Sequence, residues 1–186
     1  MISIKKWLYS LFRKKYGKTI VLGTYASGKT NLIHWLINNE LPKEYLPTNF
    51  EKQIKEFIDS TGAEYNVKNW EESIKDKKNI FYLFNMEKFF KEDIYSEDNN
   101  HIKYNEIVIY QISLLTEHFR EKTKNKKILI IGTHFDKLSS MQEAQTIITT
   151  IDKEVNLNNA KIIYGSLING YKANNIENEI KEFLKG

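Results

Sequence analysis

The chain has 186 residues, of which 41% are apolar and 28% charged, a balance typical of one globular domain with a well-filled core. Its net charge of +4, from 28 Lys and Arg against 24 Asp and Glu, is too small to indicate nucleic-acid binding. The absence of cysteine excludes disulfides, cysteine nucleophiles and thiolate metal sites. No apolar run reaches the ~20 residues that a membrane-spanning helix needs.

The first 18 residues are basic and contain no acidic residue. Within residues 1–17, apolar side chains recur at helical spacing, at Ile4, Trp7, Leu8, Leu11 and Phe12. The pattern predicts an amphipathic basic helix ahead of the first strand. Such a helix either contacts an anionic membrane surface peripherally or packs on its own domain or in a partner's groove. Because its charges are interleaved too closely for a secretory signal, we expect a cytoplasmic protein.

Short β-branched runs alternate with amphipathic stretches along the rest of the chain. The predicted strands are residues 19–22, 54–58, 80–84, 128–131 and 160–164. Helical spacing follows at residues 29–38, from Val108 to Phe119, and from Ile176 to Leu184. Residues 86–103 are acidic and rich in Asn, and we expect them to form a surface loop. The alternation predicts an α/β fold for residues 18–186, with a mostly parallel sheet and helices on both faces.

One motif follows the first predicted strand and opens the first predicted helix. It fits G-x-x-x-x-G-K-[ST] and consists of Gly23, Thr24, Tyr25, Ala26, Ser27, Gly28, Lys29 and Thr30. Small residues let backbone N–H groups wrap closely around phosphate oxygens, and the positive end of the helix adds to that field. Lys29 would reach the terminal phosphates, and the Thr30 hydroxyl would ligate Mg²⁺.

Two further elements predict metal and γ-phosphate contacts. Thr48 lies in the polar connection after the first helix and offers a second hydroxyl to the metal. Asp59 and Gly62 fit D-x-x-G at the carboxyl end of a predicted strand, where ligands bind in open α/β sheets. We expect Asp59 to hold Mg²⁺ through water and the Gly62 N–H to meet the γ-phosphate.

The last two elements predict a base-reading site. Thr133, His134 and Asp136 follow the fourth predicted strand and resemble an [NT]-K-x-D pattern with histidine in the lysine place. The Asp136 carboxylate would accept hydrogen bonds from the guanine N1–H and exocyclic amine, a paired contact that adenine lacks. Ser166 and Leu167 follow the last strand, where a backbone N–H would reach the guanine carbonyl oxygen.

With these motifs in this order, the chain resembles the Ras superfamily of small GTPases over nearly its whole length. It is most similar to the Arf group, through the Leu46-Pro47-Thr48 stretch, Trp70 and the basic amino-terminal segment. The resemblance implies a P-loop NTPase fold of the small-GTPase type with six strands and five helices. It also implies GTP or GDP with Mg²⁺ as cofactors, slow hydrolysis, and a protein effector recruited through loops that sense the γ-phosphate.

The chain departs from this family at several positions. Ala63 stands where the family carries a glutamine that orients the attacking water, so we expect hydrolysis at or below the ~10⁻⁴ s⁻¹ scale of an unassisted small GTPase. Tyr25 is bulky for the phosphate loop and would hinder an arginine supplied in trans. His134 replaces the lysine that braces that loop. Only ten residues separate Thr48 from Asp59, about half the usual distance in the family, so the family's second strand and its hairpin must be very short or missing.

Two other functions stay open on the sequence. A scaffold that holds one nucleotide permanently is compatible with Ala63 and with the short connection before Asp59. A small P-loop kinase is the other alternative, but such kinases clamp two phosphorylated substrates with several arginines. This chain offers only Arg13 and Arg120.

Overall fold

The structure is a computed structural model. It describes residues 19–38, 67, 70–91, 93–95, 101–167 and 176–185. The predicted amino-terminal helix and the predicted strand at residues 54–58 lie outside the described residues, as do Thr48, Asp59, Gly62 and Ala63.

The described part of the chain is an α/β fold built on a four-stranded, fully parallel sheet in the order β1-β2-β5-β6. The strands are β1 (Thr19–Gly23), β2 (Asn79–Asn85), β5 (Lys127–Thr133) and β6 (Ala160–Tyr164). All four were predicted from their β-branched and aromatic runs, β6 with the same bounds and the others one to three residues longer. Because the strands are parallel, the loops that follow them gather at one edge of the sheet.

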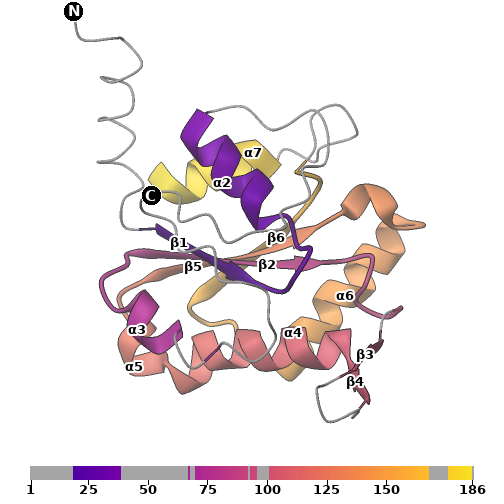
Figure 1. Cartoon of the computed structure of the whole chain (residues 1–186), viewed down its shortest axis with the longest axis horizontal. Helices are drawn as coiled ribbons and strands as arrows, with labels where there is room; N and C mark the ends of the chain where they lie inside the picture. Colours follow the sequence, from indigo (N-terminus) through magenta and orange to yellow (C-terminus); the bar gives the residue numbers. More distant parts are fainter. Residues whose placement is uncertain are drawn as a thin grey trace, which may run out of the picture.

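Helices cover both faces of this sheet (Figure 1). On one face lie α2 (Lys29–Asn38) and α7 (Ile176–Lys185). On the other lie α3 (Trp70–Ile74), α4 (Tyr104–Ser113), α5 (Arg120–Thr123) and α6 (Met141–Glu154). The helices predicted at residues 29–38, from Val108 and from Ile176 are confirmed.

Alternation along the strands explains the two faces. In β2, Phe81 and Leu83 belong to the core under α2 and α7, whereas Ile80, Tyr82 and Phe84 belong to the core under α4 and α6. Successive side chains of a strand point to opposite faces, so a strand buried on both sides must be apolar at every position. The continuous apolar runs that predicted these strands therefore reflect two cores rather than one.

The prediction of a loop at residues 86–103 is wrong in part. Turns occupy residues 86–91, but β3 (Asp93–Tyr95) and β4 (His101–Lys103) then pair as an antiparallel hairpin. Three-residue strands are too short for alternation to identify them in a sequence. The turn is also less exposed than a surface loop, since Met86 and Phe89 are buried in the core.

Two helical features were not anticipated. Helix α6 buries Ala144, Ile147 and Ile151. Its N-cap is Ser140, whose Oγ accepts a hydrogen bond from the Glu143 N–H at 3.2 Å. That serine followed by glutamate three residues later is a capping-box pattern that was readable in the sequence. The helix predicted from Val108 to Phe119 is interrupted by a π-helical turn, η2 (Leu114–His118).

Candidate nucleotide site

The predicted phosphate loop joins β1 to α2 at the carboxyl edge of the sheet. A Cβ at Gly23 would lie 2.0 Å from the Leu83 carbonyl oxygen, so the loop begins directly against β2. The Thr24 N–H donates to the same oxygen at 3.1 Å. Ala26 and Gly28 have positive φ values of 50° and 84°, which turn the chain sharply before the helix. The close approach to β2, the hydrogen bond and the positive φ values together define the backbone conformation of the loop between β1 and α2.

Lys29 lies inside this loop rather than in solvent. Its Nζ donates to the carbonyl oxygens of Gly23 at 3.1 Å and Thr24 at 2.5 Å, and the side chain is buried. The Ser27 Oγ donates to the Thr24 oxygen at 2.7 Å, which closes the loop on itself. These contacts place the Lys29 ammonium within the turn of the loop, beside the residues that would receive a phosphate.

Thr133 connects the phosphate loop to the neighbouring strands. Its hydroxyl lies 2.9 Å from the Ser27 carbonyl oxygen, 3.0 Å from that of Phe84, and 2.8 Å from His134 Nδ1. The side chain is buried. Although Thr133 and Ser27 are 106 residues apart, this hydroxyl ties the end of β5 to the middle of the loop.

The third predicted segment meets the same loop. Leu167 Cδ1 would lie 3.0 Å from a Cβ at Gly28, and both Ser166 and Leu167 are buried. The segment is held in place because the Gly165 N–H donates to the Gly132 oxygen at 2.9 Å. The structure therefore brings together the loop, Thr133 and the segment after β6, three segments that are far apart in the sequence.

His134 differs electrostatically from the lysine whose place it takes. It has a left-handed backbone conformation, with φ 59° and ψ 31°, and precedes the short helix η3 (Phe135–Lys137) that carries the half-buried Asp136. Burial lowers the pKa of His134 below its ordinary value, although the carboxylates of Asp136 and Glu87 partly oppose the shift. The imidazole is therefore neutral at neutral pH and adds no positive charge beside the loop.

Sequence reasoning missed two residues that contact the loop. The Tyr104 hydroxyl lies 2.5 Å from Thr24 Oγ1 and accepts a hydrogen bond from the Asn85 N–H at 2.8 Å, and its side chain is fully buried. Lys88, in the turn after β2, donates to the Tyr25 hydroxyl at 2.7 Å. No local motif marks either residue, because each acts on a segment more than 60 positions away.

The described residues cover only part of the predicted metal site. Thr30, at the start of α2, is the one predicted magnesium ligand among the described residues, because Thr48 and Asp59 lie outside them. Across the described ranges, no group of three or more His, Asp or Glu side chains is placed to hold a metal ion. Trp70, which carried part of the Arf resemblance, is buried and packs edge-on against Tyr82 at a ring distance of 6.1 Å.

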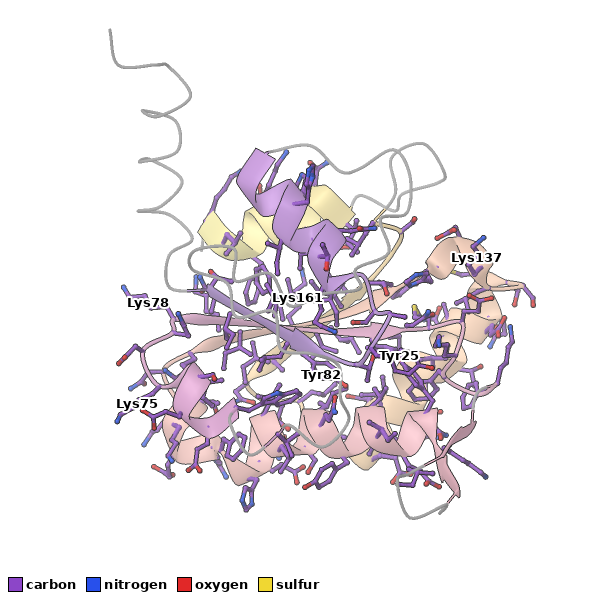
Figure 2. All side chains as sticks on the ribbon, in the orientation of Figure 1. Tyr25, Lys75, Lys78, Tyr82, Lys137 and Lys161 are labelled. Carbon is purple, nitrogen blue, oxygen red and sulfur yellow. The ribbon has the colours of Figure 1, made fainter. Side chains whose placement is uncertain are left out.

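Figure 2 shows the distribution of labelled side chains between the two ends of the sheet. Lys75 and Lys78 lie at the end where β2 begins, whereas Tyr25 and Lys137 lie toward the end where the strands finish. The candidate site is therefore on the side that parallel sheets generally use for ligands. Among the helices of the described part, none has the length and apolar character that a membrane crossing requires.

No protein-family model matches this sequence, and neither does any curated protein. The likeness to small GTPases therefore rests on the motifs and on the way the described segments meet.

Proposed function

We propose that this protein is a guanine-nucleotide-binding switch with the P-loop NTPase fold of small GTPases. It binds GTP or GDP with Mg²⁺, hydrolyses GTP slowly, and recruits a protein partner in the GTP state. The observation that carries the proposal is the meeting of the three segments, in which Thr133 contacts the Ser27 carbonyl and Leu167 packs against Gly28. Parallel strands bring the loops that follow them to one edge in any case, so the support comes from where the contacts fall: Thr133 meets Ser27 and Leu167 meets Gly28, each a residue of a predicted motif.

The phosphate end of the site is assigned to residues 23–30. Backbone N–H groups of the loop and the amino terminus of α2 receive the phosphate oxygens, and Lys29 moves from loop carbonyls to the terminal phosphates. Thr30, Thr48 and Asp59 hold Mg²⁺, and the Gly62 N–H contacts the γ-phosphate. Held by these residues, Mg²⁺ would supply positive charge that offsets the negative charge of the phosphates.

The base end of the site is assigned to the loops after β5 and β6. Asp136 accepts from the guanine N1–H and exocyclic amine, and a backbone N–H at Ser166 or Leu167 donates to the guanine carbonyl oxygen. Thr133 and His134 position these groups against the phosphate loop through the contacts described above. An adenine base would present a single acceptor where guanine presents two donors, and would leave the carboxylate without its pair.

Arg120 weighs against a phosphotransferase that clamps two substrates. It begins α5, which ends four residues before β5 starts, so it lies at the edge where the strands begin. The phosphate loop lies at the opposite edge, after β1. Arg120 therefore cannot reach a phosphate that Lys29 holds. Arg13 lies outside the described residues.

The proposal places the protein in the cytoplasm, with residues 1–17 binding either an anionic membrane surface or a protein. Liposome sedimentation of the full chain and of a chain without residues 1–16 distinguishes membrane binding from protein binding. Stronger pelleting of the full chain with anionic lipid indicates the membrane. Equal pelleting of the two chains excludes it.

The decisive test is a change of base specificity at Asp136. In Asp136→Asn, the amide donates a hydrogen bond to the second carbonyl of xanthine, so the variant should lose GTP and gain xanthosine triphosphate. The control is Asp152→Asn, which removes an exposed carboxylate from α6 without touching the site. Binding of GTP, ATP and xanthosine triphosphate is measured for the parent and both variants. Unchanged nucleotide selectivity in Asp136→Asn would show that Asp136 does not recognise the guanine base.

A permanently loaded scaffold is distinguished from a switch by nucleotide exchange. The switch predicts that GDP released from the purified protein is replaced by added GTP on a time scale of minutes to hours in excess EDTA, because Mg²⁺ contributes to retention. A nucleotide that survives this treatment unexchanged would favour the scaffold. Mass analysis of the released nucleotide identifies its base and phosphate number in the same experiment.

A further inference from the structure

The edge of the sheet opposite the phosphate loop is rich in lysine. Residues 75–78 lead into β2 and residues 124–126 lead into β5, and these two strands start side by side in the parallel register. Figure 2 shows Lys75 and Lys78 at this end of the molecule and Lys137 at the other. We call the following six residues the lysine edge: Lys75, Lys77, Lys78, Lys124, Lys126 and Lys127.

Hydrogen bonds fix the two turns of the lysine edge to each other. Lys126 Nζ donates to the carbonyl oxygens of Lys75 at 2.8 Å and Lys77 at 2.7 Å. The Lys127 N–H donates to the Lys78 oxygen at 2.8 Å. Burial lowers the pKa of Lys126, whose ammonium serves to hold the turns together. Because the turns are held in place, the remaining lysines are presented on one surface.

The lysine edge keeps a net positive charge after the neighbouring carboxylates are counted. Residues 71–78 hold three acidic and three basic residues, whereas residues 120–127 hold five basic residues against one acidic residue, Glu121. The two stretches therefore carry four net positive charges. Helix α6 runs from the end of β5 to the start of β6, so it also ends at this edge. Its last turn subtracts one charge, because it holds two acidic residues and Lys153.

Ion pairs involve only part of the lysine edge. Lys75 Nζ lies 3.6 Å from Glu72 Oε1, and Lys122 pairs with Glu71. Within the described ranges, four lysines form no ion pair: Lys77, Lys78, Lys124 and Lys127. Of these four, Lys78 and Lys124 are exposed. Their charge is therefore available to an anionic partner.

This edge offers charge without an apolar anchor. The large apolar side chains that the described part exposes are Phe90, Tyr110 and Met141. Phe90 follows β2 and Met141 begins α6, so both lie toward the other end of the sheet, and Tyr110 lies within α4. Stable protein interfaces generally bury aromatic or apolar anchors at their centre. An array of lysines without such an anchor favours a diffuse anionic layer, as formed by the headgroups of acidic lipids.

The basic amino-terminal segment joins the domain at the same edge. Thr19 begins β1 and pairs with Asn79, the first residue of β2. Residues 1–18, which precede it, hold six basic residues and no acidic residue. The lysine edge and this segment therefore meet on one side of the domain, where both can face a single anionic surface.

We propose that the lysine edge of the folded domain binds the anionic headgroups of a lipid surface and sets the orientation of the domain on it. This goes beyond the proposed function, because it uses no nucleotide contact and does not require residues 1–17 to bind lipid. The phosphate loop lies at the other end of the strands, about 20 Å away for a strand of seven residues such as β2. On a membrane, the nucleotide site then faces solution, where a protein partner can reach it.

The first test measures binding of the full chain to phosphatidylcholine vesicles with and without phosphatidylserine. Lys78→Gln combined with Lys124→Gln removes two exposed charges from the lysine edge. The control combines Lys103→Gln with Lys137→Gln, which removes two exposed charges from the opposite end and leaves the same net charge. Binding to acidic vesicles should weaken by about fivefold or more in the edge variant. It should weaken by less than about twofold in the control, because about 20 Å exceeds the screening length of about 8 Å at physiological salt.

Lys78→Arg combined with Lys124→Arg retains both charges and should bind acidic vesicles like the parent. Urea unfolding of each variant identifies any general loss of structure.

The second test measures orientation. Because the chain has no cysteine, a single introduced cysteine can carry a fluorophore. Asn125→Cys places it in the turn before β5, and Gln142→Cys places it in the first turn of α6, both at exposed positions. A quencher on the lipid headgroup should quench the label at position 125 and leave the label at position 142 unchanged.

Weaker vesicle binding confined to the edge variant, together with quenching confined to position 125, supports the inference. Equal weakening in the edge variant and the control would show that only net charge matters, and overturns it. A parent that does not distinguish acidic from neutral vesicles also overturns it and leaves an acidic protein as the partner of this surface. All of these measurements are made without nucleotide, so either proposal can fail while the other stands.

Discussion

Replacing Tyr104 with phenylalanine removes one hydroxyl from the centre of the molecule and leaves the ring in place. That hydroxyl accepts from the Asn85 N–H at 2.8 Å and pairs with Thr24 Oγ1 at 2.5 Å. Tyr104, Thr24 and Asn85 are all buried, so no solvent replaces the lost partner. The substitution therefore tests whether helix α4 supports the phosphate loop through this one group.

The expected cost follows from the two hydrogen bonds. Each contributes about 0.5–1.5 kcal/mol net, and the Asn85 N–H is left buried without its acceptor, so the free energy of unfolding should fall by about 1–3 kcal/mol. For a chain of this size each kcal/mol lowers the melting temperature by about 2–4 °C, which gives a decrease of about 2–12 °C. Because Thr24 belongs to the phosphate loop, nucleotide binding should weaken as well.

The assay is urea unfolding of the parent, Tyr104→Phe and Tyr110→Phe. Tyr110 lies on the same helix with 56% of its surface exposed, so its variant makes the same chemical change in solvent. We expect Tyr110→Phe to stay within about 0.5 kcal/mol of the parent. Equal midpoints for the two variants would refute the reasoning, since a buried bridge and an exposed hydroxyl would then contribute alike.

Three other substitutions test separate features of the site. Gly23→Ala places a Cβ 2.0 Å from the Leu83 oxygen at φ +137°, and should lower the free energy of unfolding by more than about 3 kcal/mol; a parent-like urea midpoint would contradict this. Thr133→Val removes the hydroxyl beside Ser27 and should cost about 1–2 kcal/mol and speed nucleotide release, whereas an unchanged release rate would show that the hydroxyl is dispensable. The pKa of His134 is lowered in the folded state, so its contribution to stability is complete above the unfolded value of about 6.5 and is lost as pH falls through the folded value. Asparagine tolerates the left-handed backbone at position 134, so His134→Asn should fold like the parent but lose less stability between pH 7.5 and 5.5. Equal losses of stability would show that protonation of His134 does not cause the pH dependence.

Strands β1, β2 and β5 were predictable because they are short, largely apolar and buried on both faces. Runs such as Ile128 to Ile131 carry no polar residue, so neither a surface strand nor a loop explains them. The order of the strands in the sheet was not predictable in the same way. Side-chain patterns specify which residues are buried, whereas strand order depends on how the connecting helices pack.

The hairpin formed by β3 and β4 could not be predicted from local sequence patterns. Asp93–Tyr95 and His101–Lys103 are three residues each, and composition alone favours a loop there. Their pairing joins Ile94 to Ile102 across the hairpin and is a contact between segments rather than a property of either. The π-helical turn in the long helix was equally invisible, because spacing alone does not distinguish it from a regular turn.

The residues of the candidate site also fall into two groups: those that a local motif identifies and those that act on a distant segment. Residues that act through their own backbone, such as Gly23 and Gly28, or through the loop they belong to, such as Lys29, leave a motif in the sequence. Tyr104 and Lys88 act on the loop through side chains 80 and 63 positions from their partners, and nothing around them in the sequence indicates the contact.

Tyr25 shows that a local motif and a distant contact give different information about the same residue. Its sequence position indicates only an obstacle to a partner's arginine, and Ala63 indicates only a missing catalytic group. In the structure, Lys88 Nζ donates to the Tyr25 hydroxyl at 2.7 Å and lies 4.1 Å from the ring centroid, so the turn after β2 helps to hold this side chain in place. A switch needs to distinguish its two nucleotides even if it hydrolyses one of them slowly, because partner recruitment depends on differential binding energy between the two states. Under the proposed function, the departures at Tyr25 and Ala63 slow hydrolysis and leave the contacts of the phosphate loop from Gly23 to Lys29 in place to hold the nucleotide.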